Sequence, residues 1–125
     1  MAEEPPARMP RLRIRIVFGE GAMLGPGKAE LLERIRDTGS IAAAGRAMSM
    51  SYKRAWMLVE EMNRAFRDPL VTSTRGGARG GGARLTATGD AVLAHYRKLE
   101  DIMAEAGAAR IGLLRAMLRD IPGRS

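Results

Sequence analysis

The segment from Ser40 to about Arg67 constrains the fold most, because it predicts two capped helices separated by only a few residues. Ser40 precedes the run IAAAGRAM and Ser51 precedes a second helical run, so each serine is placed to cap a helix N-terminus. The first helix is too short to be stable without neighbours. The small residues Ala44 and Gly45 allow the second helix to cross it closely. The segment therefore predicts a helix-turn-helix.

The second of these helices has one apolar face. Its apolar residues recur at intervals of three and four, as a core-facing stripe does: Ala55, Leu58, Val59, Met62 and Phe66. Met48 and Met50 flank the turn and are expected to anchor it by apolar packing. Ser49 occupies a turn position that often favours glycine. The residues left to point outward or sideways are Ser51, Tyr52, Lys53, Trp56, Met57 and Glu60.

This outward-facing set predicts contact with DNA. It places hydrogen-bond donors, a cation and flat apolar surface on the N-terminal half of one helix, the part that enters a major groove. Lys53 and Arg54 support this prediction, since cations at a helix N-terminus oppose the helix dipole, and a phosphate or a guanine edge would compensate them. The alternatives are an ordinary amphipathic helix and, for Trp56, a core or interface anchor.

A glycine-rich stretch with three arginines follows this helix, and its sequence from Ser73 to Thr86 is STRGGARGGGARLT. The β-prone run LVTST before it and the run ARLT at its end predict an antiparallel hairpin. Gly82 and Ala83 occupy the places of the P-loop lysine and hydroxyl residue, and an RGG-type tail would be longer and terminal. A flexible hairpin tip is the simplest alternative. The functional hypothesis adds that phosphates or a minor groove are contacted by Arg75, Arg79 and Arg84.

The chain before the two helices predicts a tail, a strand and a further helix. Residues 1–10 are rich in proline and predict a disordered tail. The run RLRIRIVFG then alternates basic and apolar side chains, as in a half-buried strand, with one face formed by Leu12, Ile14, Ile16 and Phe18. The stretch GEGAMLGPG breaks this strand. A helix is then predicted from Lys28 to a C-cap at Gly39.

The chain after the hairpin predicts one long helix, capped by Thr86 or Thr88 and reaching about Arg119, with a bend or boundary near Gly107. An apolar seam with alternating four- and three-residue spacing predicts a dimer interface that includes Val92, Tyr96, Leu99 and Met103. The same seam could instead pack inside one subunit.

The predicted fold class is therefore mainly α with a small β-sheet, a winged helix-turn-helix with a long C-terminal helix. The predicted domains are the disordered tail at 1–10, a DNA-binding winged helix-turn-helix at 11–87 and a C-terminal helical dimerisation segment at 88–125.

Charge and composition narrow the function further. The 125 residues carry a formal net charge of +7, which favours a polyanionic partner. Without cysteine and with a single histidine, His95, the chain predicts neither a metal nor a cofactor. Adjacent acidic pairs such as Glu60 and Glu61 diverge on a helix, so an enzyme is not expected. No signal peptide or long apolar run is present, which predicts a cytoplasmic, nucleoid-associated bacterial protein without a membrane partner.

Two stretches carry a family resemblance, GSIAAAGRAMSMSYKRAWMLVEEMN and GGARGGGARLTATGDAVLAHY. They resemble the N-terminal DNA-binding domain of the ModE family of molybdate-responsive transcription regulators, a LysR-like winged helix-turn-helix, over about Arg11 to Glu100. The resemblance implies a homodimer whose recognition helices enter successive major grooves of a palindromic operator. Carried onto this chain, it implies a wing from Arg75 to Arg84 and recognition residues Ser51, Tyr52, Lys53, Arg54 and Trp56. Full-length members continue into β-barrel domains that bind molybdate or tungstate, and molybdate binding by this chain is not expected.

The leading hypothesis is a homodimeric regulator of transcription that binds specific double-stranded DNA and is linked to molybdenum metabolism. One alternative is a nonspecific architectural or RNA-binding protein, for which RNA or single strands would compete as well as duplex. Another is a DNA-binding subunit that depends on a separate effector-sensing partner, which a pull-down would capture as a hetero-complex.

Overall fold

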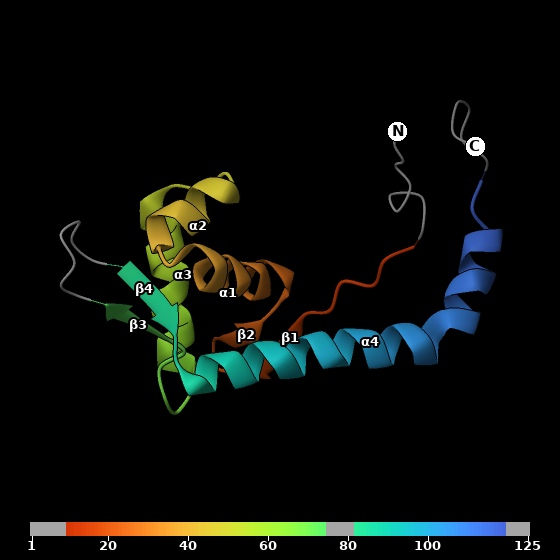
Figure 1. Ribbon diagram of the computed structural model, residues 1–125. Coiled ribbons are helices and arrows are strands. Elements are labelled where there is room, and N and C mark those ends of the chain that lie inside the picture. Colours follow the sequence, from red (N-terminus) through yellow and green to blue (C-terminus); the bar gives the residue numbers. More distant parts are fainter. Residues whose placement is uncertain (1–9, 75–81, 120–125) are drawn as a thin grey trace. The chain divides into compact units, whose positions relative to one another are not determined.

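The computed structural model describes residues 10–74 and 82–119. Along the chain its elements are β1 (Ile16–Gly19), β2 (Ala22–Leu24), α1 (Pro26–Thr38), α2 (Ile41–Ala47), α3 (Tyr52–Ala65), β3 (Val71–Thr74), β4 (Gly82–Leu85) and α4 (Ala87–Ala116) (Figure 1). The strands form two separate antiparallel hairpins, β1 with β2 and β3 with β4. The predicted class, mainly α with little β-sheet, is confirmed.

The described chain divides into two compact units. The larger covers Arg13–Arg97 and contains both hairpins, α1, α2, α3 and the beginning of α4. The smaller contains the described residues up to Leu12 and from Lys98 onward. Helix α4 has no boundary at Gly107 and ends at Ala116, and Figure 1 shows a bend in its C-terminal part, coloured blue.

Local sequence signals explain where α1 begins and ends. Pro26 occupies the first turn, where its missing N–H would have no partner within the helix in any case. The helix ends as predicted at Gly39, whose φ of 73° lies in the left-handed region that glycine tolerates. The Gly39 N–H donates to the carbonyl of Ile35 at 2.8 Å.

The two predicted serine caps are confirmed. Ser40 Oγ accepts from the N–H of Ala43 at 3.0 Å, and Ser51 Oγ accepts from the N–H of Arg54 at 3.0 Å. Such a cap stabilises a helix by about 1 kcal/mol. The serines thus set the starting points of α2 and α3.

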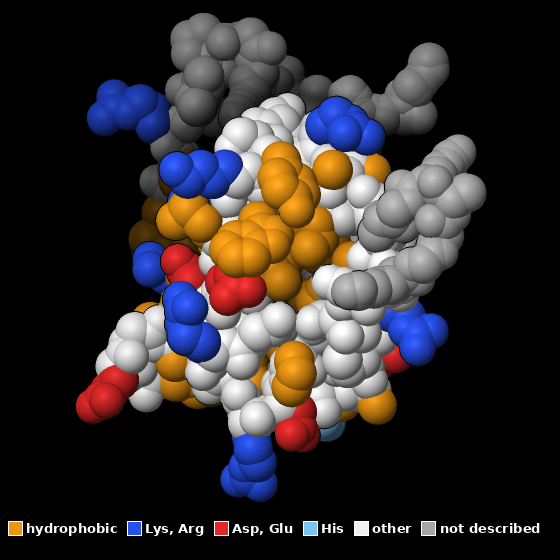
Figure 2. Space-filling model, turned by 90° about the vertical axis from the view of Figure 1, so that its left-hand side faces the viewer, with side chains coloured by type: hydrophobic (Ala, Val, Ile, Leu, Met, Phe, Trp, Pro, Cys, Tyr) orange, Lys and Arg blue, Asp and Glu red, His pale blue; other side chains and the backbone are white. Residues whose placement is uncertain are grey.

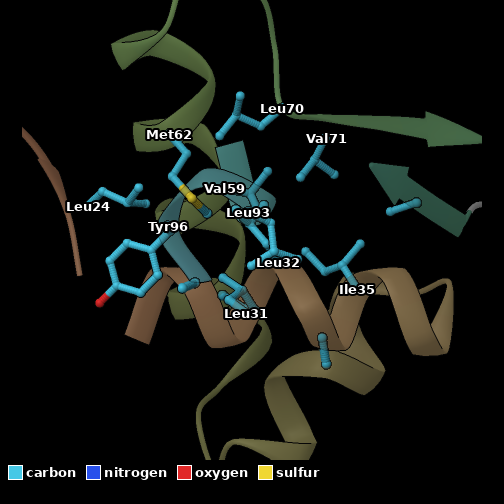
Figure 3. Packing of buried hydrophobic residues seen from close by; sticks show 14 residues of the cluster. Leu24, Leu31, Leu32, Ile35, Val59, Met62, Leu70, Val71, Leu93 and Tyr96 are labelled. Carbon is cyan, nitrogen blue, oxygen red and sulfur yellow. The ribbon is translucent and has the colours of Figure 1, made fainter. Parts of the chain in front are cut away.

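The hydrophobic core lies in the larger unit and draws on both hairpins and all four helices (Figure 3). Its largest fully buried side chains are Tyr96, Leu31, Leu32, Ile35, Met62 and Leu70. Each such aliphatic side chain stabilises the fold by about 1.5–3 kcal/mol relative to its exposed state. The predicted stripe of α3 is confirmed, because Ala55, Val59 and Met62 are buried in this core.

The predicted N-terminal strand needs correction. Strand β1 begins only at Ile16, and the stretch expected to break the strand contains its partner β2. The chain reverses at Glu20 and Gly21, with φ of 49° and 84°, so the two short strands can pair. The predicted buried face is partly wrong, since Phe18 is 58% exposed and only Ile14 and Ile16 of that face pack against the core.

Candidate nucleic-acid interface

Helices α2 and α3 cross at a position where only glycine fits without adjustment. A Cβ atom on Gly45 would lie 3.0 Å from Cβ of Ala55, which is tighter than ordinary van der Waals contact. In the turn between the helices, Ser49 has a φ of 59°, a left-handed conformation that costs a non-glycine residue roughly 1–2 kcal/mol. Met48 and Met50 pack against the core on either side of it. The turn is therefore tight, as predicted.

The crossing leaves one side of α3 uncovered at its N-terminal half. The exposed fractions there are 57% for Tyr52, 44% for Trp56 and 44% for Met57. Figure 2 shows hydrophobic side chains gathered on the side of the molecule that Figure 1 has on its left, with Lys and Arg side chains around them and acidic side chains at their lower edge. We call the following exposed residues the outer face of α3: Tyr52, Lys53, Arg54, Trp56 and Met57.

The predicted contact residue Ser51 is also exposed, and it has a structural task. Its Oγ accepts the capping hydrogen bond from Arg54. The hydroxyl proton remains able to donate, so Ser51 can contact a phosphate while it caps α3.

Charge is distributed unevenly along α3. In its C-terminal half, Glu60 lies 3.8 Å from Arg64 and Glu61 lies 3.2 Å from the buried Lys28, measured between charged atoms. Within residues 10–74 and 82–119, neither Lys53 nor Arg54 has a carboxylate at ion-pair distance. The positive end of the helix dipole thus coincides with two uncompensated cations, which favours binding of an anion there.

The hairpin of β3 and β4 has the predicted antiparallel register, with Val71 opposite Leu85 and Thr72 opposite Arg84. Successive side chains point to opposite faces, so Ala83 is buried and Arg84 is exposed. Arg84 is therefore available for contact. The predicted contacts Arg75 and Arg79 lie outside the described residues.

A residue that the sequence did not single out, Asn63, attaches this hairpin to α3. Its Oδ1 accepts from the N–H groups of Leu70 at 2.8 Å and Val71 at 3.1 Å, and its Nδ2 donates to the carbonyl of Val71 at 3.1 Å. A second tie joins β4 to the end of α1, where the N–H of Ala83 donates to the carbonyl of Gly39 at 2.9 Å. The one available signal was an asparagine, a weak helix former, in the last turn of α3.

The start of α4 is held to the same region. Thr86, the first of the two predicted caps, accepts from the N–H of Gly89 at 2.9 Å and donates to the carbonyl of Pro69 at 2.7 Å. Thr88 instead has its hydroxyl 3.4 Å from Asp68 Oδ2. A Cβ atom on Gly89 would lie 2.1 Å from the carbonyl oxygen of Leu70, so the backbones meet directly.

The predicted dimer residues divide into two groups. Val92 packs against the core and Tyr96 is 1% exposed, with its hydroxyl donating to the carbonyl of Ile14. Tyr96 therefore belongs to the core of its own chain, which corrects its assignment to an interface. Leu99 and Met103 are 37% and 45% exposed, and they remain available to a second subunit.

The part of the chain that the structure describes contains no cluster of three or more histidine and acidic side chains able to hold a metal ion. Over the same residues, no helix combines the length and the apolar character that crossing a membrane requires.

Comparison with known proteins places this site in a family. The model of the family described as "Bacterial regulatory helix-turn-helix protein, lysR family" matches residues 27–90, which include α2, α3 and the hairpin. The chain is 43% identical over 91 residues to the "Molybdenum-pterin-binding protein MopB" of Rhodobacter capsulatus, covering 73% of this chain and 32% of that protein. It is 37% identical over 81 residues to the "DNA-binding transcriptional dual regulator ModE" of Escherichia coli, covering 65% and 31%. The chain thus spans about a third of the length of these relatives.

Solved structures confirm the winged helix-turn-helix fold. Full-length LTTR LysG from Corynebacterium glutamicum, solved with its effector Arg, superimposes with a TM-score of 0.54 at 26% identity, covering 75% of this chain and 30% of that one. The DNA-binding domain of CbnR, solved in complex with DNA, superimposes with a TM-score of 0.55 at 18% identity, covering 70% and 95%. The second likeness concerns the fold alone.

Proposed function

The chain belongs to the lysR family of bacterial regulatory helix-turn-helix proteins, and from this premise we propose that it binds a specific double-stranded DNA sequence and regulates transcription. The observation that carries the proposal is the outer face of α3, which combines two cations without carboxylate partners in the described chain with exposed side chains at a helix N-terminus. Since the family is one of regulatory proteins, the chain is not an enzyme.

The two parts of the interface have different tasks in this proposal. Helix α3 enters the major groove, where base edges carry sequence information. The hairpin of β3 and β4 supplies arginines to the sugar-phosphate backbone, which raises affinity for any sequence. Asn63 supports this division, because its hydrogen bonds to Leu70 and Val71 hold the start of the hairpin against α3.

The relatives support a proposal for the assembly and the biological context. A homodimer with two copies of α3 would read a palindromic operator, and the exposed Leu99 and Met103 supply apolar surface for pairing. The names of several relatives refer to molybdenum, which supports a role in the response to molybdate, exerted at the nucleoid in the bacterial cytoplasm. Binding of molybdate by this chain is not part of the proposal.

The proposal is tested by selecting bound fragments from bacterial genomic DNA and titrating the best fragment by fluorescence anisotropy. We expect tight binding to a palindromic sequence and much weaker binding to random duplex. Affinity should fall with salt, with a log-log slope of about −0.9 for each phosphate neutralised. Equal affinity for selected duplex, random duplex and RNA would contradict the proposal and favour a nonspecific architectural protein.

Two variants test the division of tasks. Lys53→Ala should change which bases are preferred, whereas Arg84→Ala should weaken binding to all duplexes similarly and reduce the salt slope by about one phosphate. Arg64→Ala is the matched control, because Arg64 lies on the same helix but near Glu60 in the C-terminal half. An equal loss in all three variants would mean that only total charge matters.

A further inference from the structure

Three large apolar side chains on one short helix remain exposed to water. Tyr52, Trp56 and Met57 are each at least 44% exposed, although the other side of α3 packs in the hydrophobic core through residues such as Val59 and Met62 (Figure 3). We call these three residues the apolar patch of α3. A clustered apolar surface of this kind in a folded domain marks a binding surface more often than chance.

Helix geometry shows what the patch presents. At about 100° per residue, Lys53 and Met57 point away from the buried stripe of α3. Trp56 lies beside them on one flank, one turn after Tyr52, and Arg54 lies on the other flank. Lys53 and Met57 therefore lead the approach to any surface that α3 meets, and Trp56 adds apolar surface on one flank.

The surrounding charges indicate which kind of surface this is. The centre of a protein–protein interface is depleted of charged residues. Here Lys53 and Arg54 lie within and beside the patch, and no described carboxylate pairs with either. A partner that carries both negative charge and small apolar groups satisfies the whole set. In a DNA major groove, the apolar group on the base edges is the C5-methyl of thymine.

The polar side chains of α3 support the same partner. Asparagine and glutamine, which read adenine through two hydrogen bonds, do not occur between Ser51 and Glu60. The nearest amide, Asn63, is engaged with the backbone of Leu70 and Val71. Within a T:A pair, the thymine methyl is therefore the group that the apolar side chains of this helix can recognise.

Resting on the proposed function, we infer that Trp56 and Met57 read thymine methyl groups in the major groove while Lys53 binds an adjacent acceptor. The methyl group is recognised because it is buried against the apolar side chains of Trp56 and Met57. One buried methyl contributes about 0.8 kcal/mol, which corresponds to about four-fold in affinity. When both half-sites of a palindrome are changed together, the effect becomes about fourteen-fold by the same conversion.

The test uses the selected operator with thymine replaced by deoxyuridine, which removes the methyl group and leaves base pairing intact. Each thymine position is replaced in turn in both half-sites, and dissociation constants are measured by anisotropy. For the full chain we expect one or two positions at which the loss approaches fourteen-fold. Replacing cytosine with 5-methylcytosine in a T:A to C:G variant of such a position should restore part of the affinity.

The variants Trp56→Ala and Met57→Ala show which side chain contacts which thymine methyl. At the base position that the replaced side chain contacts, each variant should bind the thymine and deoxyuridine duplexes with equal affinity. Val17→Ala is the control, since Val17 is a 69% exposed apolar residue on β1 that is not part of the outer face of α3, and this variant should retain the full methyl effect. Circular dichroism and thermal unfolding verify that the variants fold.

The possible outcomes separate the two proposals. Specific operator binding that is insensitive to deoxyuridine at every position overturns this inference and leaves the proposed function intact. Methyl sensitivity that persists unchanged in both variants overturns the assignment to Trp56 and Met57. Failure to prefer any duplex overturns the proposed function and this inference with it.

Discussion

The two parts of α4 have similar apolar content but opposite surroundings. In residues 87–97, Leu93 and Tyr96 are buried in the core of the larger unit. Beyond Lys98, the large apolar side chains of the described helix are mostly exposed, including Leu99, Ile102, Met103, Leu113 and Leu114. An apolar stripe therefore predicts that a helix packs against another surface. It does not specify whether that surface belongs to the same chain or to a second one.

Specific contacts account for the burial of the first part. Its start is joined to Leu70 through Thr86, whose N–H donates to the Leu70 carbonyl at 2.9 Å. Its end is joined to α1 through an ion pair, in which Arg97 Nη2 lies 2.7 Å from Glu33 Oε1. Between these two contacts, Leu93 and Tyr96 join the hydrophobic core, and the Tyr96 hydroxyl donates to the carbonyl of Ile14.

The largest effect is expected from Tyr96→Ala. Removing this side chain, which is 1% exposed, leaves a cavity and an unpaired carbonyl at Ile14, so the free energy of unfolding should fall by about 3–5 kcal/mol. Urea unfolding followed by circular dichroism measures the change.

Two companion variants sharpen this result. Tyr96→Phe keeps the ring and removes the hydroxyl that donates to Ile14, so it should cost about 1 kcal/mol. Met103→Ala, at a 45% exposed position, should leave the unfolding of the larger unit almost unchanged. A loss from Met103→Ala equal to that from Tyr96→Ala would remove the distinction between the two parts of α4.

The next largest effect is expected from Gly89→Ala. The added Cβ would lie 2.1 Å from the carbonyl oxygen of Leu70, so α4 or the hairpin must shift. Such overpacking costs roughly 3 kcal/mol. Thermal unfolding should show the loss, and a melting temperature equal to that of the wild type would contradict the close approach of the two backbones.

A smaller effect concerns the proposed dimer. The double variant Leu99→Asp, Met103→Asp places charge on exposed apolar surface, so it should raise the dimer dissociation constant at least about tenfold. Sedimentation equilibrium measures the change. As a control, the free energy of unfolding of the larger unit is measured in dilute solution, and it should be unchanged. An unchanged dimer would place the subunit contact elsewhere.

The smallest effect is expected from Gly112→Ala in the second part of α4. No atom lies within 4 Å of the added Cβ, so the substitution meets open space. Alanine should therefore stabilise the helix by about 0.5–1 kcal/mol, in contrast to Gly89→Ala. Helix content measured by circular dichroism during heating should increase in the second part. A destabilisation similar to that of Gly89→Ala would show that this segment is covered.

Much of the candidate site could be predicted from the sequence. Ser40, Ser51 and Gly39 were identified because a cap or a C-terminal glycine acts on atoms within four residues of itself. The outer face of α3 followed from the position of its buried stripe. Strand β2 was missed because three residues between glycines show no alternation, and only pairing with β1 defines it.

The sequence by itself determined the local elements of this protein, namely the caps, the tight turn at Ser49 and the apolar stripe of α3, since these depend on neighbours along the chain. Only the tertiary structure decided that Asn63 holds the hairpin and that Tyr96 lies in the core. Tyr96 bonds a carbonyl 82 positions away, at Ile14. Periodicity records which side of a helix is apolar, but the partner that covers it comes from distant parts of the chain.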